Sequence, residues 1–172
     1  IEFSTFENSS KITPPNWYGS YAVYSDQDSS LRFYRTHTDL SRVGVTEWND
    51  RTITEAYTGF EIGMYNNASD VPWYVVSEFV STVFVEDIIY TENTANWFSN
   101  FISCSSIDVT NLKTNNVEHM EGTFYNLGGG ASPVNIIGLD TWNTSKVTDM
   151  SYMFGSTGLN AANFSLDLSG WD

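Results

Sequence analysis

The second half of the chain repeats itself with a period of 29 or 30 residues, and this repeat restricts the fold more than any other feature. Residues 114–124 align with residues 144–154 at a constant offset of 30. Three apolar pairs match in this alignment: Val117 with Val147, Met120 with Met150, and Phe124 with Phe154. Apolar residues with the spacing L-x-x-L-x-L-x-x-W precede each block, at residues 104–112 and 134–142, and the last three of these positions recur in residues 166–171. A single unit of this size cannot bury its apolar face alone, so neighbouring copies must stack.

Each copy predicts one strand and one short helix. Ile107 and Val109 alternate with polar residues, and Ile137 and Leu139 have the same spacing of two, which is the period of a strand with one buried face. Apolar residues three and four apart in residues 117–124 predict a helical face. The expected fold is therefore an α+β repeat, a leucine-rich-repeat solenoid of short parallel strands and short helices. It occupies residues 91–172 in about three copies, the last one truncated.

The first half predicts a β-rich unit that caps these repeats. After a polar lead-in over residues 1–20, residues 21–24 and 31–36 are rich in strand formers, and turn residues separate them. A further strand is expected within residues 80–89, with Val83 and Val85 on one face. No helical period continues through residues 21–90, so we expect this whole segment to form an N-terminal β-rich cap.

The repeat resembles that of a known family. Residues 139–154 read LDTWNTSKVTDMSYMF, and residues 166–172 read LDLSGWD. These motifs resemble the BspA-like leucine-rich repeat of bacterial surface proteins, over about residues 80–172. The resemblance implies a secreted or surface-anchored protein that acts in adhesion or recognition, without catalytic activity. It also implies that further repeats follow Asp172, since the last copy stops at its opening motif.

Charge and composition exclude several other classes. Seven Lys and Arg against 21 Asp and Glu give a net charge of −14, which disfavours nucleic acid and anionic membranes as partners. No apolar run approaches the roughly 20 residues of a membrane-spanning helix. Cys104 is the single cysteine and excludes an internal disulfide. His37 and His119 share no ligand spacing, so the sequence predicts no metal site and no cofactor.

The expected binding surface is the outward face of the predicted strands. It carries five candidate binding residues: Asp108, Thr110, Asp140, Asp167 and Ser169. An alternative is that these residues bind no ligand and only make this solvent-facing surface polar, which keeps the protein soluble. They do not combine a nucleophile, a base and an orienting group, so no catalytic residue is predicted.

A second hypothesis concerns the aromatic residues of the first half. Ten rings exceed what a small β core requires: Trp17, Tyr18, Tyr21, Tyr24, Tyr34, Trp48, Tyr57, Tyr65, Trp73 and Tyr74. Exposed rings would stack on sugars and make the cap a carbohydrate-binding module. Buried rings would instead fill the cap and seal the end of the repeats.

The resemblance thus implies a non-catalytic protein of the cell surface, and we expect it to be a monomer. Its expected partner is an extracellular protein or glycan. A third alternative is that these residues cap and space a longer array whose binding face lies in other repeats.

Overall fold

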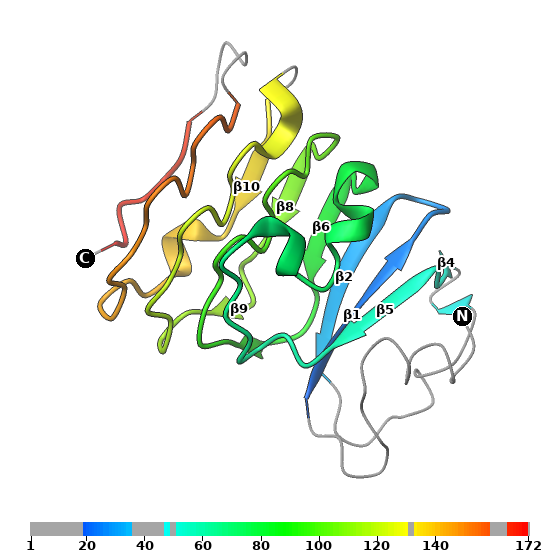
Figure 1. Ribbon diagram of the computed structural model, residues 1–172, viewed down its shortest axis with the longest axis horizontal. Helices are drawn as coiled ribbons and strands as arrows, with labels where there is room; N and C mark the ends of the chain where they lie inside the picture. The colour runs from blue at the N-terminus through cyan, green and yellow to red at the C-terminus, as the bar shows by residue number, and fades with distance from the viewer. Residues whose placement is uncertain (1–18, 36–46, 49–50, 131–132, 159–164, 172) are drawn as a thin grey trace.

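The computed structural model describes residues 19–35, 47–48, 51–130, 133–158 and 165–171, and its main element is one mixed six-stranded sheet (Figure 1). The strand order is β10-β8-β6-β2-β1-β5. The six strands are β1 (Ser20–Ser25), β2 (Ser30–Arg35), β5 (Glu55–Thr58), β6 (Thr82–Val85), β8 (Ser106–Asp108) and β10 (Asn135–Ile137). Two small sheets pair β3 (Glu47–Trp48) with β4 (Arg51–Thr52), and β7 (Ile89–Tyr90) with β9 (Leu112–Lys113).

The predicted hairpin of the first half is confirmed. Strands β1 and β2 pair antiparallel from Ser25 and Ser30 at the turn to Ser20 and Arg35 at the open end. Asp28 holds the turn, because its Oδ1 accepts hydrogen bonds from the Ser30 N–H and hydroxyl. Strand β5 pairs antiparallel with the other edge of β1.

The other strands of the large sheet run parallel. Strand β2 pairs with β6, β6 with β8, and β8 with β10, so strands of both halves of the chain share one sheet. Leu31, Val83 and Ile107 lie side by side across three of these strands and are fully buried. The predicted strand with Val83 and Val85 on one buried face is thus confirmed.

Opposite this sheet lies a second layer made of turns, which we call the turn layer and define as residues 92–100, 116–126 and 146–156. Its three segments run side by side in Figure 1. Alternate backbone N–H groups donate to the next segment: Asn96 to the Glu121 carbonyl at 3.0 Å and Gly122 to the Ser151 carbonyl at 2.9 Å. The intervening N–H groups close turns within their own segment, as Tyr125 does to the Gly122 carbonyl.

The predicted leucine-rich-repeat solenoid with short helices is wrong. The described residues contain no α-helix, and the strands of the repeats continue the mixed sheet of the first half. The 3₁₀ segments have three to six residues: η2 (Ala68–Asp70), η3 (Tyr74–Phe79), η4 (Leu127–Gly130) and η5 (Leu139–Thr141). The molecule is a sheet-dominated fold.

Backbone conformation explains why residues 117–124 are not helical. Asn96, Gly122 and Tyr152 occupy equivalent places in the three segments of the turn layer, and each has a left-handed backbone. A left-handed residue interrupts a right-handed helix. The N–H groups that a helix would use internally instead join neighbouring segments. The apolar spacing still serves burial, because Val117, Met120 and Phe124 are fully buried.

The strand of the second copy also differs from prediction, by one residue. Ile136, not Ile137, pairs with Ile107 and packs against the core, while Ile137 is 42% exposed. Gly138 is an extra residue with a φ of +95°, and a Cβ there would lie 2.5 Å from the Thr110 backbone. A shift of one residue moves a side chain to the other face of a strand.

Stacked aromatic rings fill the space between the sheet and the turn layer. Phe124 lies between Phe98 and Phe154, with ring centroids 5.6 and 5.5 Å away. Trp142 stacks on Phe124 at 5.8 Å and on Trp171 at 6.5 Å. At the other end Phe33, Phe60, Trp73 and Trp97 form edge-to-face contacts. One apolar core therefore runs through both halves of the described chain.

Candidate functional site

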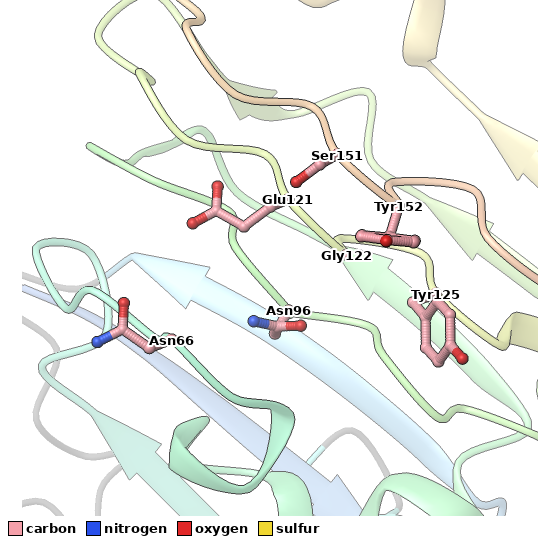
Figure 2. A pocket seen from close by; sticks show the side chains of 7 residues that line it. All are labelled: Asn66, Asn96, Glu121, Gly122, Tyr125, Ser151 and Tyr152. Atoms are coloured by element: carbon pink, nitrogen blue, oxygen red, sulfur yellow. The ribbon is translucent and has the colours of Figure 1, made fainter.

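Two hollows of about 370 Å³ each open on the outer surface of the turn layer. The first, which we call the tyrosine hollow, is lined by Asn66, Asn96, Glu121, Gly122, Tyr125, Ser151 and Tyr152 (Figure 2). The second, the charged hollow, is lined by Glu92, Asn116, Glu118, His119 and Lys146. Because consecutive segments stack in register, residues far apart in the sequence meet in each hollow.

Gly122 forms the floor of the tyrosine hollow. A Cβ at this position would lie 2.5 Å from Oδ1 of Asn96, so only glycine allows the Asn96 side chain to approach this closely. The Nδ2 of Asn96 donates to the Tyr65 carbonyl at 2.8 Å, which fixes the amide against the neighbouring loop. Close packing and this hydrogen bond therefore hold the floor of the hollow.

Two tyrosines stand at the rim of the tyrosine hollow. Tyr125 is 38% exposed and Tyr152 is 78% exposed. The ring of Tyr125 lies against Gly155, where a Cβ would come within 2.8 Å of Cδ2. Tyr152 has a φ of +55°, a region that bulky residues rarely adopt. The most exposed ring of the site is thus held in a strained backbone conformation.

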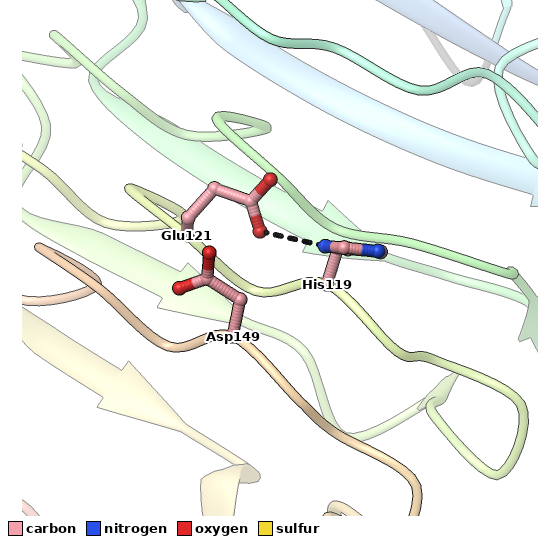
Figure 3. A group of neighbouring side chains, drawn as sticks. All are labelled: His119, Glu121 and Asp149. Carbon is pink, nitrogen blue, oxygen red and sulfur yellow. Dashed lines mark ion pairs between the residues drawn. The ribbon is translucent and has the colours of Figure 1, made fainter.

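Beside the tyrosine hollow, one histidine and two carboxylates converge (Figure 3). One ligand atom each from His119, Glu121 and Asp149 lies within 4.8 Å of the others. Nδ1 of His119 is 3.4 Å from Oε2 of Glu121. His119 pairs with Asp149 of the next segment through a parallel β-bridge, and with Asn93 of the preceding one.

Several polar atoms of this group are buried without a hydrogen bond. Within the described part of the chain, Nδ1 of His119 and Oε2 of Glu121 have no hydrogen-bond partner, although neither atom reaches solvent. The same holds for Oδ1 of Asn93, whose residue is only 3% exposed. Buried polar atoms normally have partners, since leaving them unpaired costs free energy. This arrangement is suited to a bound cation or water.

Asp149 is held in place by Ser151. The Ser151 N–H donates to Oδ1 of Asp149 at 2.8 Å. This bond and one from the Ser151 hydroxyl lower the pKa of the Asp149 carboxyl, with a smaller contribution from His119. The carboxylate is therefore charged and oriented at neutral pH. Its serine neighbour bonds to the carboxylate and not to the imidazole, so these residues do not form the serine–histidine–aspartate order of a hydrolase.

Residues 92–172 match a family of unknown function, described as Mycoplasma protein of unknown function, DUF285. The match covers just under half of the chain and includes His119, Glu121, Asp149 and most of both hollows. Asn66, on the rim of the tyrosine hollow, lies outside it. No curated protein and no solved structure matches the chain.

The binding residues predicted from the sequence lie elsewhere. Asp108 is half-buried on β8, and its Oδ1 accepts the Thr110 N–H at 3.0 Å. Asp167 makes the same turn with the Ser169 N–H at 3.0 Å, while Asp140 is exposed in η5. Among the described residues the three aspartates do not converge as His119, Glu121 and Asp149 do. Their role in binding stays a prediction.

The aromatic residues of the first half are mostly unavailable to a ligand. Six of the ten rings are buried: Tyr21, Tyr24, Tyr34, Tyr57, Tyr65 and Trp73. Tyr74 in η3 is 42% exposed. Trp17 and Tyr18 lie outside the described residues, as does the side chain of Trp48. Burial of six rings favours the core-filling interpretation over stacking on sugars.

Sequence reasoning missed the convergence of His119, Glu121 and Asp149, although a signal for it was present. The alignment of residues 114–124 with 144–154 pairs His119 with Asp149, and stacked copies place aligned positions side by side. The assumption of a helix hid the third residue. Residues two apart do not share a helix face, whereas in an extended segment they do.

Proposed function

We propose that this chain is a non-catalytic recognition module of a bacterial cell surface, and that its tyrosine hollow binds an extracellular protein or glycan. The observation that carries this proposal is Tyr152, which is 78% exposed, strained and placed at the rim of a hollow. Residues with a strained backbone cluster at ligand-binding and active sites, where the surrounding structure holds them. Tyrosine is also one of the residue types enriched among the residues that contribute most to binding at protein interfaces.

The composition of the tyrosine hollow supports the same proposal. Its lining combines Tyr, Asn, Ser and Gly with one carboxylate. Binding loops of antibodies are enriched in the first four types, because tyrosine adds contact area at low entropic cost and the others add adaptable hydrogen bonds. A hollow of about 370 Å³ is also large enough for a small ligand group.

The location and the absence of catalysis are parts of the proposal that rest on the resemblance to BspA-like surface proteins. The charge of −14 supports a partner that is neither nucleic acid nor an anionic membrane. Within the described residues, the structure has no helix of the length and apolar character needed to cross a membrane. Binding through Asp108, Thr110, Asp140, Asp167 and Ser169 is the alternative surface.

Two arrays test the proposal, one of immobilised glycans and one of purified extracellular-matrix proteins, both probed with the labelled chain. We expect binding to at least one ligand, lost in the Tyr125→Ala and Tyr152→Ala variants. Tyr74→Ala is the control, since Tyr74 is about as exposed as Tyr125 but lies in η3, outside the tyrosine hollow. Loss of binding in Tyr74→Ala alone would instead support a carbohydrate site in the first half. A triple charge reversal at Asp108, Asp140 and Asp167 tests the alternative surface. If only this variant loses binding, the ligand binds through that surface and not in the tyrosine hollow.

A further inference from the structure

We propose that His119, Glu121 and Asp149 bind a divalent transition-metal cation, and that Zn²⁺ binds more tightly than Mn²⁺, Ca²⁺ or Mg²⁺. The proposal concerns a different ligand from that of the tyrosine hollow and does not depend on it. It begins from the three side chains that Figure 3 shows converging from adjacent segments of the turn layer.

The geometry is close to that of a metal site. The three ligand atoms lie within 4.8 Å of one another. Tetrahedral zinc with bonds of about 2.0–2.1 Å separates its ligands by roughly 3.3 Å. A small rotation of the half-buried Glu121 side chain toward the Asp149 carboxylate, which Ser151 holds in place, would reduce this difference. The backbone positions are already fixed by the bridge between His119 and Asp149.

Two buried atoms of this group form a long ion pair with each other but no hydrogen bond. Nδ1 of His119 and Oε2 of Glu121 face each other at 3.4 Å, yet within the described residues neither makes a hydrogen bond. A carboxylate oxygen shielded from water requires a donor or a cation. A metal ion bonded to both atoms would satisfy them together.

The surrounding charge favours a cation as well. Glu92 and Glu118 line the adjacent charged hollow, and the facing cation there is Lys146. The Nζ of Lys146 donates to Oδ1 of Asn116 at 2.8 Å, so its hydrogen bond goes to a neutral amide and not to a carboxylate. Four carboxylates against one ammonium group give the site a local negative potential, which raises the local concentration of cations.

The ligand types select the class of metal. One imidazole nitrogen and two carboxylate oxygens form a mixed set, whereas Ca²⁺ and Mg²⁺ prefer oxygen alone. For a given set of nitrogen and oxygen ligands, Zn²⁺ binds more tightly than Mn²⁺. Three protein ligands leave a coordination position for water or for a ligand group.

Isothermal titration of the metal-stripped 172-residue chain with each of the four cations tests the proposal. We expect one equivalent of Zn²⁺ to bind, with Mn²⁺ weaker and Ca²⁺ and Mg²⁺ weaker by about tenfold or more. His119→Gln, Glu121→Gln and Asp149→Asn should each weaken Zn²⁺ binding by about tenfold or more. Asn is chosen at 149 because Asn143 makes the same turn with the Ser145 N–H.

Two matched controls identify the site. Asp167→Asn alters a carboxylate that makes the same type of turn as Asp149 but does not belong to the His119 group. His37→Gln removes the other imidazole of the chain. Both should retain binding, and Zn²⁺ should raise the melting temperature of the wild type and of both controls only. Circular dichroism checks that each variant folds. The proposal is overturned if no saturable Zn²⁺ binding occurs, or if His119→Gln and Glu121→Gln bind Zn²⁺ as the wild type does.

Discussion

Gly122 and Tyr152 occupy equivalent positions in consecutive segments of the turn layer and share a left-handed backbone, with φ of +61° and +55°. The Gly122 N–H donates to the Ser151 carbonyl, so the two positions lie side by side. Glycine adopts this conformation at no steric cost, whereas in tyrosine the Cβ atom makes it unfavourable. The repeat therefore imposes on Tyr152 a left-handed backbone that is less strained in glycine, the residue at the equivalent position 122.

Tyr152→Asn should stabilise the fold. Asparagine tolerates the left-handed region and already fills the equivalent position as Asn96, so we expect the free energy of unfolding to rise by about 0.5–1 kcal/mol. Because the Tyr152 ring is largely exposed, its removal costs little burial. Urea unfolding of both proteins measures the difference. A less stable variant would show that the ring makes packing contacts that outweigh the backbone strain.

Gly122→Ala should destabilise the fold more than Gly59→Ala. Both glycines have a positive φ, so alanine costs about 1 kcal/mol of backbone strain at either site. Only at Gly122 would the new Cβ also lie 2.5 Å from Oδ1 of Asn96, whereas nothing lies within 4 Å at Gly59. We expect an extra loss of about 1 kcal/mol from the clash and from the Asn96 hydrogen bond to Tyr65. Equal losses at the two sites would contradict this description of the floor.

Phe124→Ala should remove the centre of the aromatic stack. The ring is fully buried between Phe98, Trp142 and Phe154, and deleting such a ring costs about 3–5 kcal/mol. Phe79→Ala is the control, because Phe79 is exposed and surface changes usually stay within about 0.5 kcal/mol. Chemical denaturation compares the two variants. Comparable losses would mean that the core does not depend on the stack.

Stability should fall at alkaline pH. Burial raises the pKa of the Cys104 thiol from 9.0 to about 12, and burial together with Glu61 raises the pKa of Tyr65 from 10.0 to about 12. Above about pH 9 the unfolded chain therefore loses protons that the folded chain retains. The free energy of unfolding should decrease by up to about 1.4 kcal/mol per pH unit for each such group, until the pH passes the folded pKa.

Urea unfolding at about pH 8 and about pH 10.5 measures this decrease. Cys104→Ala should show a smaller decrease than the wild type, since it retains only the tyrosine contribution. Stability of the wild type that does not change with pH would refute the burial argument.

Below about pH 9, Cys104 should react slowly with thiol reagents. Burial raises the pKa of its thiol, and the thiolate is the reactive form.

Patterns that depend on one face of a strand could be predicted from the sequence. Alternation identified Val83 and Ile107, and turn residues around Asp28 identified the hairpin. The helix over residues 117–124 could not be excluded, because spacings of three and four bury Met120 and Phe124 equally well in a ribbon of turns. The deciding information is the left-handed backbone at Gly122, which matters only once neighbouring segments stack.

The candidate site was less accessible to sequence reasoning than the fold. His119 and Asp149 could be paired through the repeat alignment, but Glu121 joins them only in an extended segment. The extra residue Gly138 likewise shifts the strand register by one, so that Ile136 and not Ile137 faces the core. Because both residues are isoleucine, the apolar pattern does not indicate which of them is buried. Both differences arise from backbone conformations that the side-chain pattern does not specify.

The role of Tyr152 in recognition is tested most directly by two measurements that compare the wild type with Tyr152→Asn on the same samples. One is urea unfolding, and the other is calorimetric titration with the tightest ligand found on the glycan or protein array. We predict that the variant is more stable and yet binds that ligand about tenfold more weakly, because a strained, exposed ring is retained for recognition. Unchanged affinity in the variant would contradict a role of the Tyr152 ring in recognition.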